Sequence, residues 1–371
     1  MEISKRITSI DALRGIAVIL MVQQHLGYWF WDVHGATLSL VAKHPIMMTF
    51  SGMGGMAAPL FLVLAGVGMA LYFNKEVHDN KGIVFRGFLI LLLGYVLNIC
   101  TPKWFTLPSW YVLHMIGFSV VVSPLLKKCN DTVLLMIFTI ALMMAVTLQT
   151  IFNTPMVISN QFMTNASKPY GYFRLIFVDG FFPIFPWISF FIAGFLAGRW
   201  FIQNNLKKIF LFAALLTAIA LLLSILYIIP VPFTRLLYIK RFFRFSPMFY
   251  PAHTPISLLL ISGSVILFYI FAKFKEKLSF SEKNFLVVLG RISLTLLIFH
   301  VILFREGSLY LGIWKTFTKW QTGVFIVLVL VFFSVAAYFW RKIEFKFSLE
   351  WLIRFIPEKV KRLLFKNSVT H

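Results

Sequence analysis

Acidic residues are scarce in this chain. It holds 13 Asp and Glu among 371 residues, against 35 Lys and Arg, and charged residues of all kinds make up only 13%. Hydrophobic residues make up 60%, and the mean hydropathy is +0.85. A soluble domain of this length needs a much larger charged surface, so the composition excludes one and indicates a polytopic membrane protein.

Cysteine and repeated sequence are also nearly absent. The only cysteines, Cys100 and Cys129, fall on opposite predicted sides of the membrane, which argues against a disulfide between them. No internal repeat, low-complexity segment or cleavable signal peptide stands out. The net charge of +22 is spread over short loops rather than one soluble module. We therefore assign it to membrane topology and anionic lipids, and exclude a nucleic-acid partner.

Long apolar runs are the main feature that is present. Their lengths, roughly 18–23 residues, suit helices that cross a bilayer. They predict an all-α integral membrane protein, a polytopic bundle of about ten transmembrane helices. We expect one membrane domain over 1–340 and a basic amphipathic cytoplasmic tail over 341–371. The expected spans are 9–31, 54–73, 83–100, 107–126, 132–152, 183–203, 208–230, 254–273, 285–304 and 321–340.

The distribution of Lys and Arg predicts the orientation. With the N-terminus in the cytoplasm, 22 of these residues fall on the cytoplasmic side and 11 on the other. The bias favours both termini inside. One outer loop, 231–253, departs from it with Arg235, Lys240, Arg241 and Arg244. This loop either lies on lipid head groups or forms a basic lip that attracts an anionic acceptor.

Charged residues lie inside the first span, where they are costly and usually functional. Residues eleven apart in a helix fall within roughly 20° of each other, so Asp11, Arg14 and His25 share one stripe. Arg14 and His25 are roughly 16 Å apart along the axis. Asp11 and Arg14 either seal the inner end of the bundle, or Arg14 holds an anionic ligand that enters from the cytoplasm while Asp11 orients it.

Histidines gather toward the predicted outer side, which holds six of the eight. Imidazole is the side chain best suited to proton transfer near neutral pH, so we expect a catalytic centre facing the exterior. The alternative is that each is a buried residue that hydrogen-bonds between helices. We take His25 and His34 as catalytic candidates, His114 and His300 as supporting ones, and His44 and His253 as ordinary loop residues. No ligand spacing supports a metal site.

A second polar group lies in the late span that carries His300. Arg291 and His300 are nine residues apart and should point to opposite faces of one helix, whereas Ser293 and His300 share a face. We therefore expect that the two ends of this segment do not line one groove. Runs of small residues elsewhere, such as Ala65-Gly66 and Ala193-Gly194, predict closely packed helices.

Five ordered motifs carry a family resemblance. They are Arg6 and Ser9-Ile10-Asp11-Ala12-Leu13-Arg14-Gly15 with His25; Ala58-Pro59-Leu60-Phe61-Leu62-Val63-Leu64-Ala65-Gly66; Leu113-His114-Met115-Ile116-Gly117; Phe182-Pro183-Ile184-Phe185-Pro186-Trp187 with Gly194 and Gly198-Arg199; and Gly290-Arg291-Ile292-Ser293-Leu294 with His300. From about residue 5 to 340, the chain resembles the catalytic domain of heparan-α-glucosaminide N-acetyltransferase and its bacterial relatives. The spacing of Arg14 and His25 is also similar to that of the bacterial acyltransferase-three family, which O-acylates surface glycans.

The resemblance implies a transmembrane acyltransferase fold, and a bacterial inner membrane as its location. It implies that cytosolic acyl-CoA is the co-substrate, with acetyl-CoA as the expected donor, and that an extracytoplasmic amino sugar or glycan hydroxyl is the acceptor. His34 is the closest equivalent of the family's catalytic histidine, so which of His25 and His34 is the base stays open. So does the choice between direct transfer and an acyl-histidine intermediate.

The same resemblance suggests roles for the other polar residues. Arg14, Arg86, Arg199 and Arg291 would bind the phosphates of the donor. Asp11, His114, Ser293 and His300 would support catalysis or bind substrate. Membrane lipids and a glycan acceptor are the expected partners, and a homodimer is compatible with the sequence.

Two other function classes compete with the enzyme. A transporter or channel for a small anion or proton-coupled solute would use the buried Arg and His residues as its pathway. It ranks second because the chain shows no repeat. A non-catalytic scaffold leaves the charges within the membrane unexplained.

Overall fold

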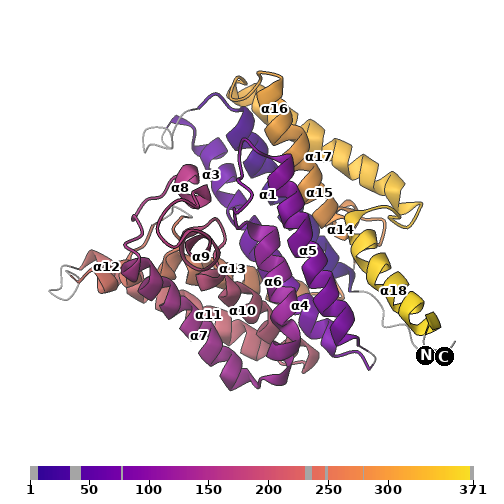
Figure 1. Cartoon of the computed structure of the whole chain (residues 1–371), viewed down its shortest axis with the longest axis horizontal. Coiled ribbons are helices and arrows are strands. Elements are labelled where there is room, and N and C mark those ends of the chain that lie inside the picture. The colour runs from indigo at the N-terminus through magenta and orange to yellow at the C-terminus, as the bar shows by residue number, and fades with distance from the viewer. Residues whose placement is uncertain are drawn as a thin grey trace. The chain divides into compact units, whose positions relative to one another are not determined.

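Helices make up nearly all of the ordered structure. The computed structural model describes residues 7–33, 43–76, 78–229, 236–246, 250–278 and 280–367, with side chains to residue 359. Within these ranges the regular elements are α-helices and two π-helical segments, and one isolated β-bridge joins Trp31 to Phe317 (Figure 1). The predicted all-α class of a polytopic membrane protein is confirmed.

Eight helical segments of the described chain are long and apolar enough to cross a membrane. Two of the ten expected spans are not among them. Helix α1 (Thr8–Phe30) has 23 residues but carries several polar side chains, and α6 (Val112–Lys128) has only 17 residues. The eight are Pro45–Phe73, which joins α3 (Pro45–Gly54) and α4 (Ala57–Phe73); α5 (Asn80–Cys100); α7 (Asp131–Ile151); α10 (Ile184–Ile202); α11 (Leu206–Ile228); α13 (Thr254–Lys273); Ser293–Tyr310; and α17 (Lys319–Arg341).

Several helices begin where a polar side chain accepts a hydrogen bond from their first turn. Asp79 caps α5 by accepting from the Gly82 N–H at 3.0 Å, and Asn130 caps α7 by accepting from the Val133 N–H at 2.9 Å. These side chains satisfy amides that the helix itself leaves without an acceptor. Similar caps begin α11, at Asn205, and α17, at Thr318.

The chain divides into two compact units. Residues 1–61 and 271–371 form the first, here called the terminal unit, and residues 62–270 form the second, the central unit. The terminal unit also contains α14 (Phe285–Arg291), α15 (Ser293–His300), η3 (Val301–Glu306), α16 (Gly307–Tyr310) and α18 (Leu349–Asn367). The central unit also contains α8 (Asn160–Thr164), α9 (Gly171–Arg174), η1 (Leu175–Asp179) and α12 (Leu237–Phe243).

Within the terminal unit, α1 packs directly on α14. A Cβ on Gly15 would lie 2.0 Å from the Leu286 carbonyl oxygen, and one on Gly290 would lie 1.8 Å from the Asp11 carbonyl oxygen. Only glycine therefore fits at either position. This contact fixes the register of the two helices and brings Asp11 beside Arg291.

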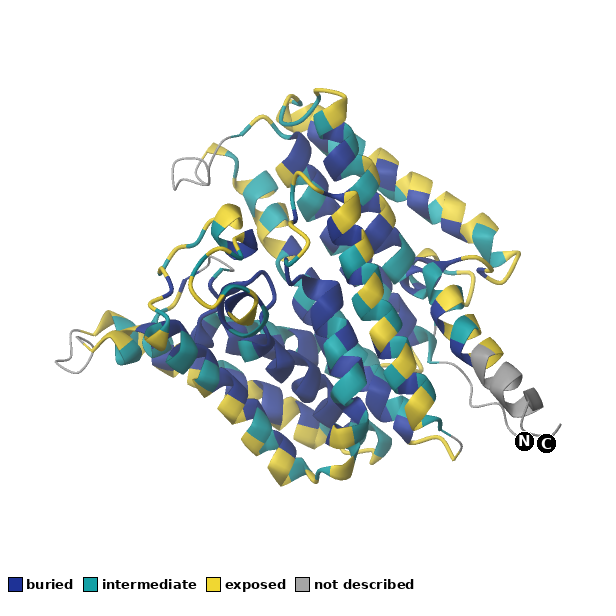
Figure 2. Ribbon diagram, in the orientation of Figure 1, coloured by how far each residue is buried: buried dark blue, intermediate teal, exposed yellow. Residues whose placement is uncertain are grey.

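Within the central unit, α10 is the most enclosed helix. Figure 2 shows it as a mostly buried ribbon, whereas α17 of the terminal unit exposes much of its length. A Cβ on Gly194 of α10 would lie 1.9 Å from the Val63 carbonyl oxygen of α4, and one on Gly66 would lie 2.0 Å from the Phe191 carbonyl oxygen. The close packing predicted from these small residues is confirmed.

Candidate active site

The polar stripe of α1 begins with a buried carboxylate that meets two arginines. Asp11 is only 2% exposed. Its Oδ1 lies 3.2 Å from Nη1 of Arg14, and its Oδ2 lies 3.9 Å from Nε of Arg291 on α14. Arg291 also contacts Glu282, with 3.3 Å between Nη2 and Oε1. The structure thus brings together three of the predicted site residues at one end of the terminal unit.

The late span is broken at Ile292. Helix α14 ends at Arg291, Ile292 has non-helical angles of φ −120° and ψ 28°, and α15 begins at Ser293. Arg291 and His300 nevertheless both meet α1, at Asp11 and at His25. The expectation that they point to opposite faces is wrong, because it assumed one continuous helix, whereas the expectation that they line no common groove stays a prediction. The break resets the helical phase between them.

His25 and His300 form a hydrogen-bonded pair. Nδ1 of His25 lies 2.8 Å from Nε2 of His300, and Nδ1 of His300 lies 2.8 Å from the Leu296 carbonyl oxygen. A carbonyl only accepts, so Nδ1 of His300 carries the proton and Nε2 is an acceptor. His25 then donates from Nδ1 and keeps its lone pair on Nε2. The bonding pattern therefore makes His25 Nε2 the basic atom of the pair.

Trp29 completes this cluster. Its ring stacks on His25 with centroids 4.9 Å apart and on His300 with centroids 5.6 Å apart. Trp29 and His300 are fully buried, whereas His25 is half-buried and is the more accessible of the two imidazoles. Sequence analysis did not single out Trp29. Its position four residues after His25, on the same face of α1, is the signal that would have found it.

A π-helical segment follows His300 directly. This segment, η3, places Arg305 and Glu306 in the interior, 8% and 4% exposed, with 3.8 Å between Arg305 Nη1 and Glu306 Oε1. The Arg305 guanidinium also lies 4.3 Å from the centre of the Trp314 ring. Single π-helical turns within α-helices are frequently found at functional sites. Nothing in the sequence pattern predicted this one.

Glu350, at the start of α18, caps the broken helix. Its Oε1 accepts from the backbone N–H of Leu294 at 2.6 Å and of Thr295 at 3.3 Å, and its Oε2 accepts from the Thr295 hydroxyl at 2.6 Å. The amides at the start of α15 have no partner within their own helix, so this carboxylate satisfies them. The tail thereby supports the helix that carries His300. Burial raises the pKa of Glu350.

His114 belongs to the central unit and makes local contacts. Its Nδ1 accepts from the Tyr111 N–H at 3.0 Å, which caps the first turn of α6. The ring is fully buried beside Gly94 and lies 4.4 Å from Tyr95, measured between ring centres. Arg86 is half-buried on α5 of the same unit. The roles suggested for these two residues remain predictions.

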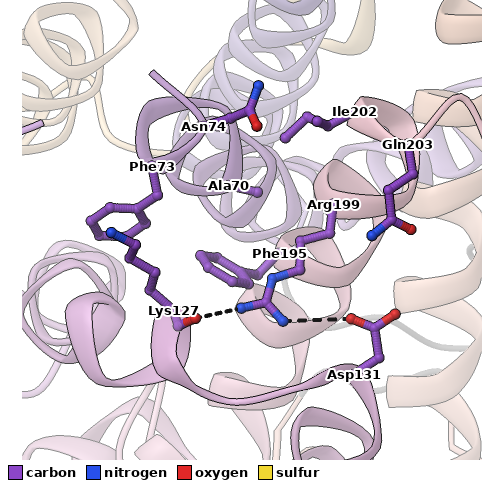
Figure 3. Close-up of a pocket in the computed structure, with 9 residues that line it drawn as sticks. All are labelled: Ala70, Phe73, Asn74, Lys127, Asp131, Phe195, Arg199, Ile202 and Gln203. Carbon is purple, nitrogen blue, oxygen red and sulfur yellow. Dashed lines mark hydrogen bonds and ion pairs between the residues drawn. The ribbon is translucent and has the colours of Figure 1, made fainter. Parts of the chain in front are cut away.

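Arg199 lines a pocket of about 350 Å³ in the central unit (Figure 3). Its guanidinium donates to the carbonyl oxygens of Cys129 at 2.7 Å and Lys127 at 2.8 Å, and Nη1 lies 3.5 Å from Asp131 Oδ1. It thus closes the C-terminal end of α6. Lys127 also lines the pocket and hydrogen-bonds to His78. The pocket residues are Ala70, Phe73, Asn74, Lys127, Asp131, Phe195, Arg199, Ile202 and Gln203.

His34 and Ser293 are the remaining residues that the sequence predicted for the site. His34 lies outside the described residues. Ser293 is half-buried at the first position of α15, two turns before His300. Among the described residues, no group of three or more His, Cys, Asp and Glu side chains is arranged to hold a metal ion.

Comparison with known protein families identifies a match. A family model described as heparan-alpha-glucosaminide N-acetyltransferase, catalytic, matches residues 6–226. No curated protein matches the chain. The matched range includes Asp11, Arg14 and His25, whereas Arg291 and His300 lie beyond it. The pairing of His25 with His300 is therefore seen in the structure and is not covered by the match to the family model.

Proposed function

The chain belongs to the heparan-alpha-glucosaminide N-acetyltransferase catalytic family, and from this membership we propose that it moves an acetyl group from acetyl-CoA to an amino sugar or glycan hydroxyl. The family indicates a membrane acyltransferase. The donor, the acceptor and the direction of transfer are our proposal. We place both termini in the cytoplasm on the strength of the Lys and Arg distribution. The cytosolic donor, the acceptor on the outer side and the bacterial inner membrane are proposed from the resemblance to the family and its bacterial relatives.

In this proposal His25 Nε2 acts as the base. It removes a proton from the acceptor amine or hydroxyl as that atom attacks the thioester carbonyl carbon. The new C–N or C–O bond forms, the C–S bond breaks, and its electron pair leaves with the sulfur. His25 then returns the proton to the departing thiolate. His300 contributes by accepting from His25 Nδ1, which holds the ring in the tautomer that keeps Nε2 basic.

The same lone pair also suits covalent catalysis. If His25 Nε2 attacks the thioester carbonyl carbon first, the C–S bond breaks and CoA leaves as the thiolate. The acceptor then attacks the acetyl carbon, the bond to Nε2 breaks, and the acceptor's proton passes to the thiolate. Rapid quenching of the enzyme with labelled acetyl-CoA separates the two routes. Label that stays on the protein before acceptor is added indicates the covalent route.

Considered by itself, the Arg199 pocket of the central unit suits a nucleotide such as that of the donor. Two features support this proposal. Lys127 supplies a cation for phosphate, and Phe73 and Phe195, whose faces lie under Lys127 Nζ and the Arg199 guanidinium, add ring surface to the pocket. The pocket lies at the start of α7, on the side that the charge distribution assigns to the cytoplasm.

The hydrogen bond between His25 and His300 is the observation that carries the proposal. The test is transfer of labelled acetyl groups from acetyl-CoA to glucosamine-terminated acceptors by the purified protein. His25→Ala should lower kcat by about 10²–10⁴-fold. The matched control is His44→Asn, which removes another half-buried imidazole from the terminal unit. Unchanged kcat in His25→Ala would show that this histidine is not the base.

A further inference from the structure

A second group of buried charges lies in the central unit, at the opposite end of α7 from the Arg199 pocket. Asp179, at the end of η1, is 1% exposed. Its Oδ1 lies 2.5 Å from Lys168 Nζ, its Oδ2 lies 2.5 Å from Arg174 Nη2, and the Thr154 hydroxyl donates to Oδ2 at 2.9 Å. The Lys168 and Arg174 side chains are only 7% and 8% exposed. One carboxylate is thus already shared by two buried cations.

A third buried cation joins this group through Thr154. Arg241 of α12 is 2% exposed, and its Nη2 donates to the Thr154 carbonyl oxygen. Its Nε and Nη1 are buried without a hydrogen-bond partner in the part of the chain that the structure describes. A guanidinium stays protonated in proteins, so it cannot escape this cost by losing its charge. Burying an unpaired charge is expensive.

No further acidic residue is near in the sequence to neutralise Arg241. Asp179 is the only Asp or Glu between Asp131 and Glu276. Three buried cations and one carboxylate leave an excess of two positive charges at this end of the unit. The loop 231–253 was expected to lie on lipid head groups or to form an exposed basic lip. Arg241 does neither, because the structure buries it, and Arg235 lies outside the described residues.

Two neutral side chains at the entry to α13 are also buried. His253 is 2% exposed and lies near Arg241 and the Met156 backbone, and Ser257 is 1% exposed with no hydrogen-bond partner for its hydroxyl among the described residues. His253 directly precedes α13, and its carbonyl oxygen accepts from the Ser257 N–H at 3.0 Å, so the two residues are neighbours on the first turn. Burial, with Arg244 and Arg241 close by, lowers the pKa of His253 to about 4. His253 is therefore not the ordinary loop residue that the sequence suggested.

We propose that Arg241, His253 and Ser257 form a binding site for a compact oxyanion, a sulfate, phosphate or carboxylate group. Arg241 offers its charge and the unpaired N–H groups at Nε and Nη1, which point to different sides of the guanidinium, and His253 and Ser257 would each add one further donor. The N-terminal end of α13 adds a favourable dipole. The bound anion would neutralise the excess positive charge and supply acceptors for donors that the protein leaves unpaired.

Two sources share this chemistry, a charged substituent on a sugar and a lipid phosphate. The first rests on the proposed function, under which the oxyanion belongs to the acceptor. The site itself stands without that function, because it follows from burial, charge and unpaired donors alone. Its test is therefore a binding measurement that needs no turnover, so its failure and the failure of the acyltransferase proposal are distinguishable.

The experiment measures the thermal unfolding of the full-length protein in lipid-free detergent, with sodium sulfate or phosphate titrated against sodium chloride at equal ionic strength. Sulfate or phosphate should raise the Tm of the wild type in a saturable way, since a ligand that binds only the folded state stabilises it. Arg241→Gln should weaken anion binding at least tenfold. Lys240→Gln is the matched control, because it removes the same charge from the exposed neighbour and should leave the response unchanged.

Arg241→Gln has a second expected signature. Without added anion its Tm should equal or exceed that of the wild type, because the substitution removes an unpaired buried charge. If Arg241→Gln does not fold, His253→Gln and Ser257→Ala each remove one neutral donor and should weaken anion binding several-fold. A wild type that responds to sulfate and phosphate no more than to chloride would overturn the proposal. So would an Arg241→Gln or His253→Gln protein that responds as the wild type does.

Lipid nanodiscs then identify the source. In phosphatidylcholine discs the response to sulfate should persist. If it disappears in phosphatidylglycerol discs, a lipid phosphate occupies the site, and if it persists there, a soluble or sugar-borne oxyanion does. Either result supports the site.

Discussion

His25 and His300 are 275 positions apart in the chain, yet Nδ1 of the first lies 2.8 Å from Nε2 of the second. The Leu296 carbonyl fixes the tautomer of His300, and His300 fixes that of His25. This order of donors distinguishes the two imidazoles. In the proposed reaction, His25 meets the substrate and His300 positions the His25 ring.

Substitutions at His300 should separate positioning from general destabilisation. In His300→Gln a side-chain oxygen can still accept from His25 Nδ1, whereas His300→Leu removes the acceptor. We expect kcat to fall roughly tenfold in the first and roughly 10²-fold in the second, within the range of a general-base contribution. KM for acetyl-CoA should stay unchanged in both. Equal losses in the two variants would contradict the positioning role.

Two residues of the Arg199 pocket should respond differently to mutation. Lys127→Gln should raise KM for acetyl-CoA several-fold while the Tm stays near that of the wild type. Arg199→Gln should instead lower the Tm, because three carbonyl oxygens at the end of α6 lose their donor. Lys207→Gln is the control for charge, since Lys207 is exposed nearby in sequence and does not line the pocket. Steady-state kinetics and thermal unfolding measure both effects.

Removing the Glu350 cap should weaken the broken helix. Glu350→Ala leaves two amides and one hydroxyl at the start of α15 without their acceptor, which should cost about 1–3 kcal/mol of stability. Glu350→Gln keeps one acceptor oxygen and should cost less. Glu358→Ala, at an exposed position of the same helix, should cost little. Thermal unfolding ranks the three, and a Glu358→Ala protein as unstable as Glu350→Ala would contradict the capping role.

Two glycines of α1 provide a matched test of the contact with α14. A Cβ on Gly15 would lie 2.0 Å from the Leu286 carbonyl oxygen, whereas one on Gly27 would meet nothing within 4 Å. Gly15→Ala should destabilise the protein by roughly 1–3 kcal/mol through overpacking. Gly27→Ala should be neutral or stabilising by up to about 1 kcal/mol, since alanine favours helix. The difference in Tm between these variants measures the effect.

Acidification should destabilise the central unit through His253. Its pKa is about 4 in the folded protein, compared with 6.5 for an unperturbed histidine. Between these values the unfolded chain binds a proton that the folded protein does not, so stability falls as the pH falls from about 6.5 to 4. His253→Gln should flatten this part of the stability curve by up to about 1.4 kcal/mol per pH unit.

The sequence predicted the features that depend on composition and short-range spacing. Apolar runs indicated the all-α membrane class, glycines at Gly66 and Gly194 indicated close helix packing, and charges within α1 indicated the polar stripe. Helical periodicity also placed Asp11 and Arg14 on one face correctly, because α1 is continuous.

The same periodicity failed where the backbone departs from a regular helix. Ile292 breaks the late span, so the angle between Arg291 and His300 could not be obtained from their spacing. The cap from Glu350 and the burial of Arg241 and His253 depend on contacts between distant segments. No local pattern contains these contacts, and an isolated histidine beside a basic loop resembles an ordinary surface residue until its burial is known.

The glycine contact between α1 and α14 also limits how this protein can move. Sliding either helix along the other by one residue would move a larger side chain into the position of a glycine. Even a methyl group would collide with the backbone of the other helix there. The contact therefore holds Arg14 and Arg291 at a fixed spacing. Under the proposed function, donor and acceptor would be brought to a reaction point that this rigid helix pair supports, rather than to a site that slides between the helices.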